Sequence, residues 1–205
     1  MPKPHRILLI YPCSAGKPYY KSRSYRLLFK TLSSLGDLRK EIHLVTISEP
    51  FALIPEEFYG KKTKWHDWES SWYDCPGLFK WWCLKHGQIY KEEHLEKCIQ
   101  ILAYYISNFL KRVKLKECYS RIIAFVRTYS SGLRKRKDHT HRRIIELASK
   151  IANVQVYIHP PKEVVAEIVS KNGRLAWDMY GVAHPIAQEY LRSLLLNALS
   201  DGEER

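Results

Sequence analysis

The stretch Arg6-Ile-Leu-Leu-Ile-Tyr11, followed by Pro12, decides the fold class of this 205-residue chain. A continuous apolar run of this length that ends at a proline is typical of a strand buried on both faces of a sheet. Three later stretches are also rich in apolar and β-branched residues, and we predict strands there as well. They span residues 41–47, 121–126 and 154–158.

Apolar residues recur at helical spacing between and after these stretches. The three apolar stripes span residues 95–113, 144–151 and 186–198. Ser24 is the expected N-cap of an earlier helix that ends at Gly36. Strands that alternate with helices predict an α/β fold with three α/β/α layers and a mostly parallel sheet. No linker divides the sequence, so we expect one domain over residues 1–205.

The composition favours an anionic partner, because 34 Lys and Arg residues face 21 Asp and Glu residues and give a formal net charge of +13. Five cysteines without a regular spacing indicate free thiols in a reducing compartment. The first apolar run is too short for a signal peptide, and no stretch is long enough to span a membrane. We therefore expect a cytoplasmic protein with no membrane contact.

Ligands of α/β sheets bind beyond the carboxyl ends of the strands. Three loops qualify, and they span residues 12–24, 48–58 and 127–137. The first loop places Cys13 and Lys17 just before a predicted helix N-terminus, where a thiol can become nucleophilic and an anion can bind. The alternative is that Cys13 is a small residue that ends a buried strand, with solvated lysines nearby.

The first loop, Pro12-Cys13-x3-Lys17-Pro18-Tyr19-x2-Ser22, resembles the PC-x3-KPY-x2-S-x2-H motif of the archaeosine synthase family, which modifies archaeal tRNA. Two further blocks occur in the family's order. Residues 48–57 resemble its S-x-P-x-G-L-V-P-x-E-L stretch, and residues 73–76 resemble its Tyr-Asp-Pro segment. The chain thus resembles the core domain of that family in a stand-alone form.

This resemblance implies a uracil-DNA-glycosylase-like core that adds the amine of free lysine to the nitrile of 7-cyano-7-deazaguanine in tRNA. A radical-SAM partner then converts the adduct to archaeosine in the family. The positions that would be catalytic are Cys13, Lys17, Tyr19 and Ser22, and we add Asp74 as a proton acceptor or a ligand of the base edge. The positions expected to bind substrate are Pro12, Ser14, Ser24, Ser48, Glu49 and Pro50.

Two versions of the chemistry fit these residue types. A Cys13 thiolate adds to the nitrile carbon and is then displaced by the amine, or the amine adds directly and Cys13 only packs or orients. Lys17 would lower the thiol pKa or stabilise charge on nitrogen. Either Glu49 or Glu56 would bind the cationic amine, unless both are simply exposed acids.

The sequence departs from the family in two respects. Tyr25 stands where the motif ends in His, which removes a titratable group. The chain also has no room for the transglycosylase-like and RNA-binding domains of full-length members. A separate subunit would then recognise tRNA, or the core would act on another substrate.

A basic segment follows the third predicted strand and is the expected contact with nucleic acid, with binding that falls as salt rises. Its members are Arg127, Arg134, Lys135, Arg136, Lys137, Arg142 and Arg143. The alternative is an ordinary solvated helix start. Cys83-x2-His86 is an incomplete zinc pattern, so we expect neither a metal nor a cofactor.

The sequence favours a transferase of archaeosine biosynthesis that acts on tRNA with lysine or another amine as co-substrate. One alternative is a non-catalytic subunit that binds tRNA or a nucleobase within a modification complex. The other is a nucleobase glycosylase-like enzyme that acts on DNA.

Overall fold

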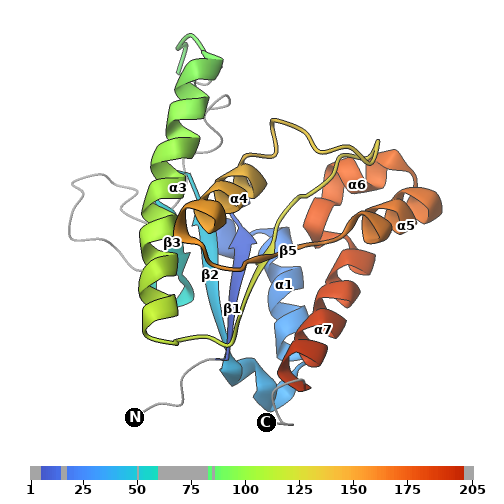
Figure 1. Cartoon of the computed structure of the whole chain (residues 1–205). Helices are drawn as coiled ribbons and strands as arrows, with labels where there is room; N and C mark the ends of the chain where they lie inside the picture. Colours follow the sequence, from blue (N-terminus) through green and yellow to red (C-terminus); the bar gives the residue numbers. More distant parts are fainter. Residues whose placement is uncertain (1–5, 15–17, 50, 60–82, 85, 201–205) are drawn as a thin grey trace.

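The computed structural model describes residues 6–14, 18–49, 51–59, 83–84 and 86–200 (Figure 1). Five strands form one sheet in the order β3-β2-β1-β4-β5. They are β1 (Ile7–Pro12), β2 (Ile42–Ser48), β3 (Ala52–Pro55), β4 (Arg121–Phe125) and β5 (Tyr157–His159). All neighbouring pairs are parallel except β2 and β3, which are antiparallel. The predicted α/β class is therefore confirmed, with a mixed sheet.

Helices cover both faces of this sheet (Figure 1). One face packs against α1 (Arg23–Ser33), α5 (Lys162–Asn172), α6 (Arg174–Tyr180) and α7 (Pro185–Ser200). The other face packs against α3 (Glu92–Leu115) and α4 (Thr140–Ala152).

Strand β1 explains why the deciding stretch is continuously apolar. Ile7, Leu9 and Tyr11 point into the layer of α1 and α7, whereas Leu8 and Ile10 point into the layer of α3 and α4. All five side chains are fully buried. Because side chains alternate between the two faces of a strand, only a strand covered on both sides needs apolar residues at every position.

The structure corrects several predicted boundaries. Ser22, not Ser24, is the N-cap of α1, and its hydroxyl accepts a hydrogen bond from the Tyr25 amide at 3.3 Å. The last strand begins at Tyr157, because Val154 and Val156 are buried in the α3–α4 layer before the chain enters the sheet. No sequence pattern described above predicts β3, α5 or α6.

None of the described helices is long and apolar enough to cross a membrane. The likeness to uracil-DNA glycosylases stays a prediction.

Candidate functional site

The carboxyl ends of the parallel strands bring three segments together. Cys13 follows the central strand β1, and Glu49 follows the adjacent strand β2. The Cys13 amide donates to the Ile47 carbonyl at 3.0 Å, which continues the pairing of β1 with β2 by one residue. The N-terminus of α4, which begins at Thr140, supplies the third segment.

A thiol, an imidazole and a carboxylate form a cluster here. Cys13 Sγ lies 3.7 Å from His141 Nε2, and the same nitrogen lies 3.6 Å from Glu49 Oε1. Thr140 donates its hydroxyl hydrogen to Glu49 Oε1 at 2.6 Å, which holds the carboxylate in place. The side chains of His141 and Glu49 are 15% and 13% exposed, and Cys13 is partly buried. The cluster is thus sheltered but can be reached from solvent.

This arrangement suits an activated nucleophile. An imidazole beside a thiol can take its proton, and a nearby carboxylate stabilises the resulting imidazolium. One nitrogen, His141 Nε2, faces both the sulfur of Cys13 and the carboxylate of Glu49. The other ring nitrogen takes no part in either contact.

The two candidate acids occupy different environments. Arg39 donates to both carboxylate oxygens of Glu56, at 2.6 Å and 2.5 Å, and so neutralises that acid within the fold. Glu49 instead lies against the imidazole of His141. Of the two, Glu49 is the acid beside the thiol.

A second thiol lies in the electrostatic range of Glu49. Burial raises the pKa of Cys98 on α3, and the negative charge of Glu49 raises it further. Cys98 therefore stays protonated at neutral pH and is a weak nucleophile.

The serines predicted for the site have varied surroundings. Ser22 caps α1, and Ser24 Oγ lies 3.4 Å from the buried hydroxyl of Tyr11. Ser48 is completely buried, Ser14 is partly buried, and Pro12 ends β1. Ser22 and Ser24 thus lie at the N-terminus of α1.

Four further predicted positions cannot be placed in this site. Lys17, Pro50 and Asp74 lie outside the described residues. Tyr19 begins a short 3-10 turn, Tyr19–Lys21.

Tyr25, the residue that replaces the motif histidine, lies in the core. Its side chain is fully buried, and its hydroxyl hydrogen-bonds to Thr46 on β2, which also bonds to Tyr59. The titratable ring beside the thiol is His141, which was not among the predicted site residues. The available signal was its place at the start of a helix that follows a strand end.

The predicted basic segment divides into exposed and internally paired cations. Arg134, Lys135, Arg136 and Lys137 are exposed, although Lys135 pairs with Glu146 and Arg136 pairs with Asp138. Arg142 is only 6% exposed and pairs with Glu146, whereas Arg143 pairs with Glu96. The first four residues therefore form the accessible part of this segment.

Arg127 connects the loop after β4 to α6. Its guanidinium donates to the carbonyls of Trp177 and Asp178 at 3.0 Å and 2.9 Å and packs against the Trp177 ring. Trp177 Nε1 donates to the Tyr129 carbonyl at 2.8 Å. Burial lowers the pKa of Arg127, and the two carbonyls that accept its hydrogen bonds fix the guanidinium in place.

No group of three or more His, Cys, Asp or Glu side chains suited to a metal ion occurs in the described part of the chain. The cluster around Cys13 consists of one thiol, one imidazole and one carboxylate that contact one another through a shared nitrogen.

Comparisons with known proteins agree with the motifs. Residues 1–81 match a family described as a domain of unknown function, DUF5591. The archaeosine synthase subunit alpha of Thermoplasma acidophilum is 28% identical over 120 residues, which cover 58% of this chain and 18% of that protein. The subunit of Thermococcus kodakarensis is 38% identical over 58 residues, which cover 28% of this chain and 10% of that protein. The subunit of Methanosarcina acetivorans is 41% identical over 51 residues, which cover 25% of this chain and 8% of that protein.

The chain thus spans less than a fifth of the length of these curated relatives. A crystal structure of AF0587, a protein of unknown function, aligns with 92% of this chain and 44% of its own, with 17% identity and a TM-score of 0.45. Over the matched residues, this chain is thus similar to a DUF5591 domain and to three archaeosine synthase alpha subunits, as its motifs indicate.

Proposed function

We propose that the chain acts in archaeosine tRNA modification and adds lysine, or a related amine, to the nitrile of 7-cyano-7-deazaguanine in tRNA. The names of the relatives support the pathway. The observation that carries the chemistry is the contact of the Cys13 thiol with His141, which in turn lies against Glu49. A core of the uracil-DNA-glycosylase kind would suit a base that leaves the RNA stack.

The proposed reaction begins with attack of the Cys13 thiolate on the nitrile carbon. A carbon–sulfur bond forms, one π bond of the nitrile opens, and its electron pair moves to nitrogen. Nitrogen then takes the proton that His141 holds, which gives a neutral thioimidate. This step replaces one difficult addition by two easier ones.

The amine completes the reaction. Its lone pair attacks the thioimidate carbon, the carbon–sulfur bond breaks, and Cys13 leaves as a thiolate. The nitrogen that has attacked gives up a proton to the pair formed by His141 and Glu49, so the product is a neutral amidine or its protonated form. Nothing is oxidised or reduced. Lys17 and Asp74 are proposed to assist, by stabilising charge on nitrogen and by accepting a proton.

The carboxylate of Glu49 has a second role in this proposal. Lysine and other amines arrive as cations at neutral pH, and a half-sheltered carboxylate attracts them. Proton transfer to the same cluster then produces the nucleophilic amine.

The tRNA substrate would approach across the exposed cations Arg134, Lys135, Arg136 and Lys137. Their charge favours phosphate contacts, which are strong at low salt and weaken as counterions compete. A separate subunit that recognises tRNA, and a radical-SAM enzyme that consumes the adduct, are the proposed partners.

The test is incorporation of isotopically labelled lysine into tRNA that carries the cyano-deazaguanine base, measured by mass spectrometry of the digested RNA. We expect incorporation by the native chain and its loss in Cys13→Ala and His141→Ala, with tRNA affinity unchanged. Cys98→Ala is the matched control, because that thiol is held protonated beside the site.

Three results would change the proposal. Binding of tRNA without incorporation, in the native chain and with candidate partners present, would favour the non-catalytic subunit. Release of a free base from DNA would favour a glycosylase. Full activity of Cys13→Ser would remove the covalent step, because a serine hydroxyl is a far weaker nucleophile.

A further inference from the structure

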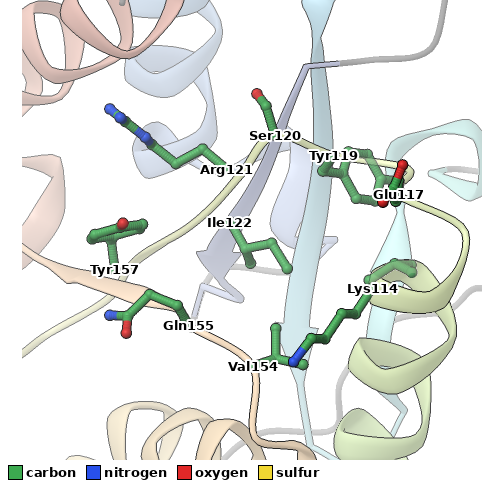
Figure 2. Close-up of a pocket in the computed structure, with 10 residues that line it drawn as sticks. Lys114, Glu117, Tyr119, Ser120, Arg121, Ile122, Val154, Gln155 and Tyr157 are labelled. Atoms are coloured by element: carbon green, nitrogen blue, oxygen red, sulfur yellow. The ribbon is translucent and has the colours of Figure 1, made fainter.

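A hollow of about 610 Å³ opens at the amino ends of the parallel strands, whereas Cys13 lies at their carboxyl ends (Figure 2). It lies between the end of α3, the start of β4 and the segment that leads into β5. Strand β5 pairs with β4 only from Ile123 onward, so Arg121 and Ile122 extend beyond their neighbour. The hollow occupies the space beside this extension, and its volume lies in the range of ligand sites.

The lining combines cations, hydroxyls and an exposed aromatic ring. Arg121 lies against the ring of Tyr157, with 5.6 Å between the guanidinium carbon and the ring centroid. Tyr157, on the edge strand β5, is 44% exposed. Figure 2 shows Arg121 and Tyr157 side by side, with Lys114 across the hollow toward Val154.

Positive charge dominates this edge. Lys114 uses one hydrogen-bond donor on the Asn153 carbonyl at 2.9 Å, which leaves two donors on the same ammonium group. The last turns of α3 and its C-cap add the exposed cations Lys111, Arg112 and Lys116, against the single acid Glu117 in the lining. Burial raises the pKa of Tyr119 to about 12, so its phenol stays neutral and does not repel an anion.

Part of this charge has a simpler explanation. Cations in the last turn of a helix stabilise the negative end of the helix dipole. That effect accounts for Arg112 and Lys114, which occupy the last turn of α3. Arg121, in contrast, is on a strand and lies against the partly exposed ring of Tyr157.

We infer that this amino-edge hollow binds an RNA strand, with a base stacked on Tyr157 and phosphates held by Lys114 and Arg121. Stacking on an aromatic ring flanked by cations is the usual way in which proteins hold unpaired nucleotides, with little dependence on sequence. An acidic protein segment would use the cations but not the flat face of the ring.

The inferred site is separate from the thiol cluster. The hollow and the thiol cluster lie at opposite ends of the strands, separated by the length of β1, which has six residues at about 3.3 Å each. The inference rests on the proposed function only in naming RNA as the polyanion, since the binding requires neither the modified base nor the amine.

The test is fluorescence anisotropy of the full chain with a labelled, unmodified single-stranded RNA of about 12 nucleotides. Tyr157→Leu should raise the dissociation constant at least about fivefold, because one stacked base is lost. The double change Lys114→Gln with Arg121→Gln should weaken binding further and reduce its dependence on salt. Tyr157→Phe keeps the ring and Lys30→Gln removes an exposed lysine on α1, so both should bind like the native chain.

Three results would overturn the inference: no RNA binding by the native chain, equal affinity of Tyr157→Leu and Tyr157→Phe, or unchanged affinity of the double variant. Thermal unfolding of each variant separates lost binding from lost folding. Cys13→Ala should bind this RNA normally. RNA binding through the hollow, together with no lysine incorporation in the separate tRNA assay with candidate partners present, would contradict the proposed function and leave this site standing.

Discussion

His141 Nε2 lies 3.7 Å from the sulfur of Cys13, although 128 positions separate the two residues in the sequence. The contact exists because α4 starts where the chain returns from β4, the parallel neighbour of β1. Two segments that are distant in sequence thus meet at one edge of the sheet, and their chemistry can be tested directly.

Replacing His141 by Gln should slow the alkylation of Cys13 by iodoacetamide at pH 7 by about tenfold or more, because a nearby imidazole increases the thiolate fraction. Peptide mass spectrometry gives the rate for each thiol in one sample. The rate at Cys118 should not change, and His94→Gln on the exposed side of α3 is the matched variant. Equal Cys13 rates in both variants would contradict the assigned role of the imidazole.

Replacing Glu49 by Gln should lower the turnover of amine transfer by about a hundredfold, since the amide cannot accept a proton. The hydrogen bond from Thr140 can persist, so folding should be little affected. Glu56→Gln is the control, because Glu56 pairs with Arg39 elsewhere in the fold and contributes about 1 kcal/mol or less. If turnover fell equally in the two variants, Glu49 would have no special function.

Replacing Gly181 by Ala should lower the free energy of unfolding by about 1–3 kcal/mol. Gly181 has φ +51°, and a Cβ there would lie 2.7 Å from Arg127 Nη2. The guanidinium would have to leave the carbonyls of Trp177 and Asp178. Urea unfolding measures the change, and Gly132→Ala, whose Cβ would lie 3.7 Å from its nearest neighbour, should stay within about 0.5 kcal/mol. A stable Gly181→Ala would show that this connection tolerates displacement.

Stability should decrease as the pH falls from 7.5 toward 5. Burial lowers the pKa of His139, His159 and His184 below the value of about 6.5 that unfolded histidines have. Above that value both states are neutral at these positions. As the pH falls through about 6.5 the unfolded chain takes up protons first, so the free energy of unfolding falls until the lowered pKa is passed.

Urea unfolding across this pH range tests the slope. His159→Gln should flatten it, because Gln does not titrate and its amide can still bond to the Tyr190 hydroxyl. His94→Gln, at an exposed position, should leave the slope unchanged. A native chain whose stability is constant from pH 7.5 to 5 would contradict this account.

The sequence predicted the inner strands well because burial on both faces leaves a continuous apolar run, as in Ile7–Tyr11. It failed at β3, which lies within the predicted loop of residues 48–58, although an antiparallel edge strand tolerates proline at its end. It placed β5 too early because Val154 and Val156 are apolar for another reason, their burial in the α3–α4 layer. Apolar character shows that a residue is buried, but not which element it joins.

The candidate site was predictable only where it depends on local sequence pattern. The place of Cys13 and Glu49 at strand ends follows from local pattern, and both were selected. The part played by His141 depends on the strand order, which no local pattern contains, and its neighbours Arg142 and Arg143 made the segment look like a surface for phosphate. Tyr25, which stands at the position of the motif histidine, lies in the core.

The central position of β1 has a practical consequence. Its side chains contribute to both helical layers, and Cys13 continues directly from its last residue. A shift of this strand by one residue would move the sulfur by about 3.3 Å, enough to separate it from His141. The alkylation rate of Cys13 thus reports on the packing of both helical layers. Variants with disturbed packing can be identified from this rate without any substrate.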